Sequence, residues 1–197
     1  MTQTPRSNHI ELMIDIETMS AQVNASILTI GATYFDPRTV DTEEQLREQS
    51  ALFGPISFLS NEKEGRHFSP QTMEWWLQQS QEAQAALFEG NILPLRAALE
   101  QFRQWVINLK PAPSLIWANS PSFDCAIVHN AMDQLNMMWP FKFWEERDVR
   151  TIKHLAYPDG DHPHFETGTA HDAVDDCIKQ VLLVQHCATK LGVYNAT

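Results

Sequence analysis

Residues 9–17, with the sequence HIELMIDIE, decide the fold of this chain. Apolar side chains occupy every second position of this stretch, which is the period of a β-strand. Asp15 and Glu17 lie together on its other face, where Glu11 is expected to be solvated. Two adjacent carboxylates repel each other, so the pair indicates either a divalent cation between them or a solvated strand face.

The pattern of the following residues predicts an α/β protein. Residues 27–35 and 51–59 have the pattern of two more strands, so the chain begins as an antiparallel meander. From Ser69-Pro70 onward, where a serine cap precedes a helical proline, helices alternate with short strands. The expected elements are one or two helices up to residue 87, helices over 92–109, 123–136 (capped by Ser122) and 171–191, and strands over 115–118 and 143–149.

We therefore expect one domain over residues 1–197, built as a mixed β-sheet with α-helices on both faces. Residues 1–8 are polar and are expected to form a disordered tail, without the apolar centre of a secretory signal. No apolar stretch approaches the ~20 residues needed to cross a bilayer, so no membrane partner is expected. Three cysteines without a CxxC pair are typical of reduced thiols in a cytoplasmic protein.

The net charge of −11 limits the classes of function that fit this chain. Phosphate backbones favour positive fields, so a protein that coats nucleic acid is disfavoured. An enzyme with an acidic cleft filled by cations is compatible with this charge, because bound metals offset several carboxylates.

Two further acidic groups follow the first pair. Asp124 comes directly after the apolar strand 115–118, at the start of a helix, where α/β proteins place functional groups. It could equally serve only as a favourable partner of the helix dipole. The sequence HDAVDD at 171–176 places His171 and three aspartates at the start of the last helix. Helical periodicity does not choose among the three aspartates. It favours Asp176 slightly, because Asp176 lies at the margin of the apolar stripe of this helix whereas Asp172 points away from it.

Together these groups resemble the active site of the DEDDh exonucleases of the ribonuclease H-like, DnaQ-like superfamily. The family's D-x-E motif matches Asp15 and Glu17, and its second motif matches Asp124. Its H-x-A-x-x-D motif matches His171 and Asp176. More narrowly, the chain is similar to phage DexA-type exonucleases and related bacterial exoribonucleases in the segments MIDIETMS (13–20), TMEWWLQQS (72–80) and NSPSFD (119–124).

The resemblance implies a ribonuclease H-like fold and a metal-dependent 3′→5′ exonuclease. Asp15, Glu17, Asp124 and Asp176 would hold two Mg²⁺ or Mn²⁺ ions, which prefer hard carboxylate oxygens. His171 would act as the general base on the attacking water, a role that histidine fills most often in enzymes. The implied partner is single-stranded RNA or DNA with a free 3′ end, and the implied products are nucleoside 5′-monophosphates.

The expected substrate contacts lie close to the motifs. Thr18 and Met19 follow the first motif directly and could touch the terminal nucleotide, and Phe123 could wedge beside its base. Trp75 could stack on a base, although with Trp76 it could instead belong to a core or an interface. A local run of basic residues could guide phosphates or form a solvated face: Lys142, Arg147, Arg150 and Lys153.

Other functions fit the same residues. A phosphohydrolase of small nucleotides could use a similar metal cluster. A catalytically silent nucleic-acid-binding module on the same fold would have lost one of the five motif residues, and all five are present. No residue decides between RNA and DNA. The aromatic content and the resemblance would both fit a homodimer.

Overall fold

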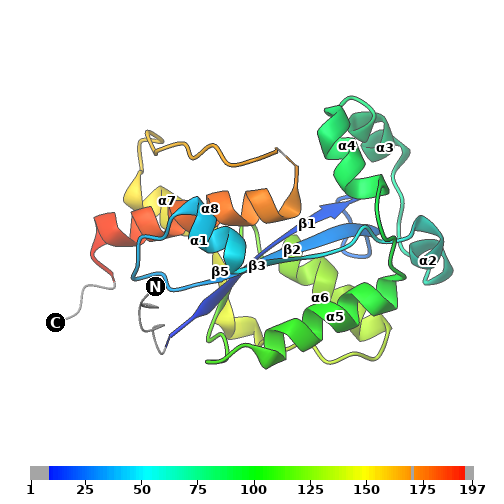
Figure 1. Ribbon diagram of the computed structural model, residues 1–197, viewed down its shortest axis with the longest axis horizontal. Helices are drawn as coiled ribbons and strands as arrows, with labels where there is room; N and C mark the ends of the chain where they lie inside the picture. Colours follow the sequence, from blue (N-terminus) through cyan, green and yellow to red (C-terminus); the bar gives the residue numbers. More distant parts are fainter. Residues whose placement is uncertain (1–8, 170, 194–197) are drawn as a thin grey trace.

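A single mixed sheet organises the computed structural model, which describes residues 9–169 and 171–193. The strands run in the order β3-β2-β1-β4-β5 (Figure 1). The antiparallel meander consists of β1 (Glu11–Thr18), β2 (Ile27–Phe35) and β3 (Ser50–Phe53). The parallel part adds β4 (Ile116–Ala118) beside β1 and β5 (Glu146–Asp148) beside β4. The expected mixed sheet, of the kind found in ribonuclease H-like proteins, is confirmed. The tail predicted for residues 1–8 lies outside the described residues.

Helices cover both faces of the sheet (Figure 1). One face packs on α5 and α6, and the other packs on α1, α7 and α8. The helices are α1 (Glu43–Glu48), α2 (Phe58–Lys63), α3 (Pro70–Trp76), α4 (Gln81–Phe88), α5 (Leu95–Asn108), α6 (Asp124–Gln134), α7 (Val149–Ala156) and α8 (Ala173–Leu191), with a 3-10 turn η1 (Phe143–Glu145) before β5.

Successive side chains of β1 point to opposite faces of the sheet and so pack against different helix layers. Leu12, Ile14 and Ile16 belong to the apolar cluster with α5 and α6. Met13, on the other face, belongs to the cluster with α7 and α8. Because side chains two residues apart on a strand share a face, Asp15 is directed to the side of α8.

Gly31 of β2 allows α8 to begin very close to the sheet. Gly31 lies opposite Asp15 in the β1–β2 register. A Cβ atom at Gly31 would lie 2.2 Å from the carbonyl oxygen of Ala173, the first residue of α8. The absence of a side chain therefore lets the N-terminal turn of α8 reach the part of β1 that carries the acidic pair.

Several local predictions were wrong, each because a tertiary contact or a turn prevailed over the local pattern. The strand expected over 51–59 ends at Phe53, since Gly54-Pro55 interrupts it, and Ser57 then caps α2. In addition, α1 lies in a polar stretch for which no element was predicted, and a Thr42–Gln45 capping box and the buried Leu46 stabilise it.

Two further details also differ from the prediction. Ser122 does not cap α6; its hydroxyl pairs with that of Ser120, and no side chain caps this helix. Glu11 is buried rather than solvated, because its carboxylate accepts hydrogen bonds from the indole of Trp117 and from His9. The strand expected within residues 143–149 is present as β5, directly after η1. Within residues 9–169 and 171–193, no helix combines the length and apolar character that crossing a membrane requires.

Substituting Gly31→Ala should destabilise the protein by about 1–3 kcal/mol, because the added methyl group forces α8 away from β2. The measurement is the free energy of unfolding in urea, compared with wild type. A variant as stable as wild type would show that the approach of α8 does not need a glycine.

Candidate active site

The acidic pair lies at the end of β1, at the edge of the sheet where the parallel strands β1 and β4 end. Asp15 and Glu17 share the face that α8 covers, and Glu17 is only 9 % exposed. The amide nitrogen of Gln180, on α8, donates a 2.8 Å hydrogen bond to Oδ1 of Asp15. The pair is therefore not a solvated strand face, because α8 closes over it.

Asp124 reaches the same place from the other layer. It is the first residue of α6, six residues beyond the end of β4, and it is 5 % exposed. Its Oδ1 accepts a 3.3 Å hydrogen bond from the backbone N–H of Ile16, the residue between Asp15 and Glu17. This bond joins the start of α6 to the end of β1, so the carboxylate does more than interact with its own helix dipole.

The start of α8 supplies the remaining two groups. Asp172 is the N-cap, and its side chain accepts hydrogen bonds from the N–H groups of Val174 and Asp175. His171 precedes this cap with φ at +63°, a left-handed conformation that turns the chain into the helix. Potential ligand atoms of Glu17, His171 and Asp176 all lie within 4.8 Å of one another.

A cleft of about 390 Å³ contains these five residues. Its lining comes from the end of β1, the β4–α6 connection, the first turn of α7 and the start of α8. The lining residues are Asp15, Ile16, Glu17, Asn119, Ser120, Phe123, Asp124, Arg150, His171 and Asp176. The three motifs, far apart in sequence, thus meet in one cleft.

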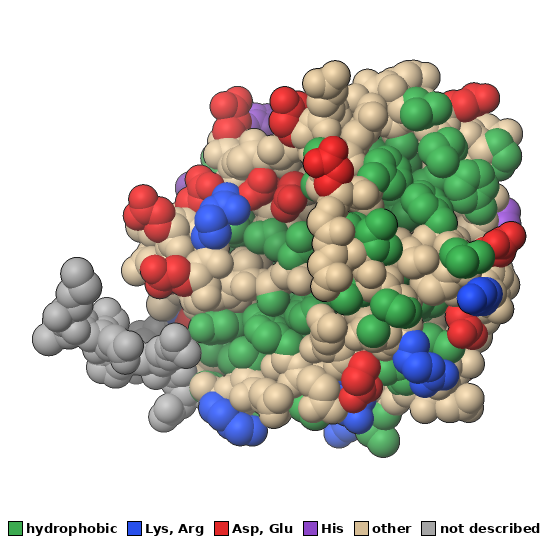
Figure 2. All heavy atoms as spheres, turned by 45° about the vertical axis from the view of Figure 1, so that its right-hand side comes forward, with side chains coloured by type: hydrophobic (Ala, Val, Ile, Leu, Met, Phe, Trp, Pro, Cys, Tyr) green, Lys and Arg blue, Asp and Glu red, His purple; other side chains and the backbone are tan. Residues whose placement is uncertain are grey.

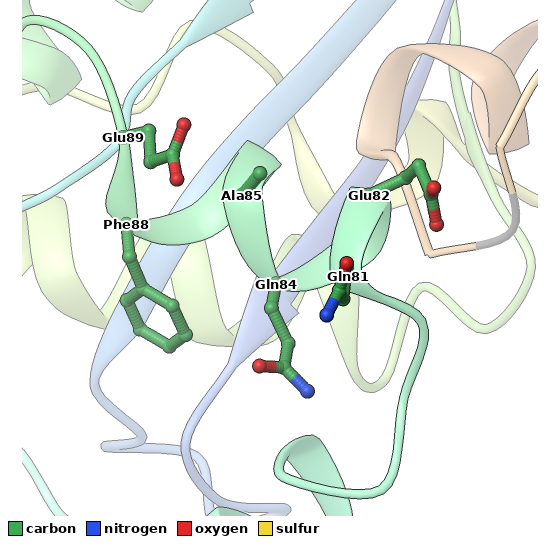
Figure 3. Close-up of a pocket in the computed structure, with 6 residues that line it drawn as sticks. All are labelled: Gln81, Glu82, Gln84, Ala85, Phe88 and Glu89. Carbon is green, nitrogen blue, oxygen red and sulfur yellow. The ribbon is translucent and has the colours of Figure 1, made fainter.

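A second hollow, of about 500 Å³, lies along α4 (Figure 3). Its lining residues come from that helix and its C-cap Glu89, and they include Gln84 and Phe88. It lacks the convergence of several elements that the acidic cleft shows, and no histidine lines it. The larger hollow is therefore not the better candidate for a catalytic site.

Burial and mutual repulsion dominate the electrostatics of the acidic cleft. Burial, followed by the charges of Asp124, Glu17 and Asp176, raises the pKa of Asp15 well above its usual value. Burial and the neighbouring carboxylates raise the pKa of Glu17 to about 9. Burial raises the pKa of Asp124 to about 7, against the opposing hydrogen bond from Ile16. Such a site attracts cations, because a positive charge relieves the repulsion.

The aromatic residues near the cleft divide into one core residue and one surface residue. Trp76 is 1 % exposed, and its indole N–H donates a 3.0 Å hydrogen bond to the carbonyl oxygen of Thr18. Trp75 is 42 % exposed, and its ring centroid lies 4.9 Å from that of His171 in an edge-on arrangement. Trp75 is therefore the tryptophan that a substrate beside His171 can reach.

The other three residues expected to contact the substrate, Met19, Thr18 and Phe123, differ in how far they are buried. Met19 is fully buried in a cluster with Leu28 and Trp76, so it supports the site from below and offers no surface to a nucleotide. Thr18 is 8 % exposed, and its hydroxyl donates to the carbonyl of Ser20. Phe123 lines the cleft while packing partly against the core.

Two polar residues of the site have no motif of their own in the sequence. Gln180, which holds Asp15, lies one helical turn after Asp176, and this i, i+4 spacing was the only signal for it. Arg150 is the one member of the basic run that lines the cleft. Arg147 instead donates to the carbonyl oxygens of Trp144 and Glu146, and Lys142 lies over the Trp144 ring.

Solved nuclease structures share this fold. The crystal structure of cell-death related nuclease 4 (CRN-4) superposes with a TM-score of 0.61 and 16% identity, over 93% of this chain and 64% of that one. E. coli exonuclease I in complex with a dT13 oligonucleotide gives a TM-score of 0.64 and 14% identity, over 94% of this chain and 42% of that one. The chain thus spans less than two thirds of either structure.

The exodeoxyribonuclease of enterobacteria phage T4 is 28% identical over 211 residues, which cover 89% of this chain and 88% of that protein. Fold and sequence together define a hydrolase of the 3′-5′ exonuclease class, which acts on nucleic acids. Within that class, the family model of the 3′-5′ exoribonuclease Rv2179c-like domain matches residues 10–188. The chain belongs to this family, and the resemblance to DnaQ-like exonucleases is confirmed.

The stability of the metal-free protein should decrease as the pH rises from 6 to 8.5. Folded Glu17, with a pKa of about 9, keeps a proton that the unfolded chain, with the ordinary value of 4.5, releases. The unfolded state therefore binds fewer protons in this interval, and a higher pH favours it. Melting temperatures measured in EDTA test this expectation.

Glu17→Gln should flatten this pH dependence and raise the stability at pH 8.5 by about 1 kcal/mol or more, since one pKa unit corresponds to about 1.4 kcal/mol. Glu44→Gln, on the exposed surface of α1, is the matched control and should leave the slope unchanged. Equal slopes for wild type and Glu17→Gln would contradict a strained, protonated carboxyl group in the cleft.

Proposed function

We propose that this protein removes nucleoside 5′-monophosphates from the 3′ end of single-stranded RNA or DNA by metal-dependent hydrolysis. The observation that carries the proposal is the meeting of Asp15, Glu17, Asp124, His171 and Asp176 in one cleft. The family and the relatives supply the reaction class. The active-site type is that of the DEDDh exonucleases, with four carboxylates and a histidine.

The four carboxylates fit a pair of Mg²⁺ or Mn²⁺ ions. Their oxygens are the hard ligands that these ions prefer. Burial first, and then the neighbouring carboxylates, raise the pKa values of Asp15 and Glu17, and bound cations would offset both effects. Bound divalent cations supply activation of the attacking water and stabilisation of charge on the leaving 3′ oxygen. Gln180 keeps one oxygen of Asp15 in place and leaves the other free for a ligand role.

His171 would serve as the general base that accepts the proton of the attacking water. It lies beside Glu17 and Asp176, on the rim where water enters the cleft. Trp75 and Trp76 pack edge-on against its ring, with centroids 4.9 and 6.0 Å away, which restricts the orientations of the imidazole. A base held in a fixed position is the arrangement that proton transfer requires.

Arg150 would bind a phosphate of the substrate. It lines the cleft from the first turn of α7, opposite a set of carboxylates that would otherwise repel nucleic acid. Trp75 would stack on a base near the 3′ end, and Phe123 would contact the terminal base. The net charge of −11 and the scattered basic side chains on the face in Figure 2 favour a single strand over a duplex, which needs a broad basic platform.

Buried thiols and exposed aromatic residues support two further proposals, on the compartment of the protein and on its oligomeric state. Three buried free thiols, Cys125, Cys177 and Cys187, support the proposal that the protein acts in a reducing, cytoplasmic compartment.

Phe143 and Trp144 are 81 % and 57 % exposed, which supports a homodimer in which a second copy covers them. Sedimentation of the purified protein at several concentrations tests the homodimer.

The decisive experiment is a time course on 5′-labelled single-stranded RNA and DNA oligonucleotides with Mn²⁺, Mg²⁺ or EDTA. We expect a ladder that shortens from the 3′ end, disappears in EDTA, and is absent from the Asp15→Asn/Glu17→Gln double variant. The faster substrate identifies the preferred sugar. Intact oligonucleotides beside hydrolysed mononucleotides would favour a small-nucleotide phosphohydrolase, and binding without cleavage would favour a silent module.

His171→Ala should lower kcat by about 10²–10⁴-fold with little change in KM, because a general base acts in the transition state. His164→Ala, an exposed histidine of the preceding loop, is the matched control and should remain fully active. A kcat within a factor of two of wild type for His171→Ala would exclude His171 as the base.

Arg150→Ala should raise KM for oligonucleotides about tenfold or more, since a charge-assisted hydrogen bond contributes roughly 1.5–3 kcal/mol. It should also reduce the dependence of KM on salt concentration, because one phosphate contact is lost. Lys153→Ala, one turn later on α7 and outside the cleft lining, should change neither quantity. Identical salt dependence for Arg150→Ala and wild type would remove Arg150 from the binding surface.

A further inference from the structure

The segment that leads to His171 is fastened by a carboxylate outside the catalytic set. Asp175 lies in the first turn of α8, next to Asp176, and is 7 % exposed. It does not line the cleft. Its surroundings are instead the residues just before His171 and the helix α1.

Both oxygens of the Asp175 carboxylate are engaged. Oδ2 accepts a 2.6 Å hydrogen bond from the backbone N–H of Thr169. Oδ1 accepts a 2.7 Å charge-assisted hydrogen bond from Nη2 of Arg47, on α1. The Asp175 carbonyl oxygen also accepts from the hydroxyl of Thr167, at 2.9 Å. These contacts, together with its place outside the cleft lining, separate the role of Asp175 from that of Asp176.

Gly168 allows this close contact. A Cβ atom at Gly168 would lie 1.9 Å from Oδ2 of Asp175, and its φ of +39° is one that other residues rarely adopt. The segment can therefore lie directly on the Asp175 carboxylate only with glycine at this position.

The chain is fixed on both sides of His171. Thr169 is held by Asp175, and the backbone N–H of Asp172 donates a 3.2 Å hydrogen bond to the carbonyl oxygen of Thr169. Asp172 is in turn fixed as the cap of α8. His171 lies between these anchors, with its φ at +63°.

We propose that Asp175, assisted by Arg47, is a positioning residue that holds His171 at the cleft. The proposal rests on the function proposed above, in which His171 is the general base. The residue binds neither metal nor substrate; it determines where the base is held. A displacement of the order of 1 Å at a catalytic group can cost about 10²-fold in rate, so the contribution is large enough to measure.

The test compares Arg47→Ala, Asp175→Asn and Gly168→Ala with the control Glu43→Gln. Glu43 is the other partner of Arg47, through an exposed i, i+4 ion pair, and does not touch the segment. We expect the three variants to lower kcat about tenfold or more while the Mn²⁺ concentration that half-maximally raises the melting temperature stays the same. Glu43→Gln should match wild type in both measurements.

A double-mutant cycle separates positioning from general damage. Asp175→Asn and Arg47→Ala are each combined with His171→Ala, and coupled residues give a non-additive result. We expect no further loss of activity in the His171→Ala background, because the base that Asp175 positions is already absent. An equal loss in both backgrounds, or wild-type kcat in an active enzyme, would overturn the proposal.

A second measurement does not depend on activity. The imidazole signals of His171, assigned by their disappearance in His171→Ala, are recorded by NMR in wild type, Arg47→Ala and Glu43→Gln. A changed His171 signal in Arg47→Ala alone is expected, and an unchanged signal would overturn the proposal even if no nuclease activity were found. If wild type cleaves no oligonucleotide while this signal still changes, the proposed function fails and the positioning contact stands.

Discussion

Repulsion among four carboxylates in one cleft is the constraint on which the rest of the structure depends. Burial and like charge both oppose ionisation of these groups. The fold distributes them over β1, α6 and α8 and gives two of them a neutral hydrogen-bond donor. Asp124 has the N–H of Ile16, and Asp15 has the amide of Gln180. In the function proposed above, divalent cations would bind in this cleft and relieve the repulsion among the carboxylates.

The close packing of α8 on the sheet is the second requirement. Glycine is needed at two positions: a side chain at Gly31 would meet the first residue of α8, and a side chain at Gly168 would meet the carboxylate of Asp175. Asp175 and Asp176 are neighbours in the first turn of α8, yet their surroundings differ. The carboxylate of Asp175 accepts hydrogen bonds from Thr169 and Arg47, whereas Asp176 lines the cleft.

Local sequence patterns were sufficient for the features that depend on local periodicity. The alternation in β1 predicted that Asp15 and Glu17 share a face, and the order of strands and helices predicted the mixed sheet. Motif spacing, rather than helical periodicity, selected Asp176 among three aspartates. Contacts between residues far apart in the sequence leave no local signal, so they could be seen only in the folded chain. Examples are the hydrogen bond between Glu11 and Trp117, the ion pair between Asp175 and Arg47, and the burial of Trp76 beside an exposed Trp75. For the same reason α1 could not be predicted from its polar sequence, because the burial of Leu46 against the rest of the fold stabilises it.

The distribution of the cleft over the whole chain has a consequence for the protein as it is made. β1 is synthesised before α6 and α8, whereas His171 and Asp176 lie at the start of α8. A nascent chain that has not yet added α8 holds Asp15, Glu17 and Asp124 but neither His171 nor Asp176. With the function proposed above, the growing polypeptide, although surrounded by RNA, would therefore carry an incomplete active site until α8 is made and folded.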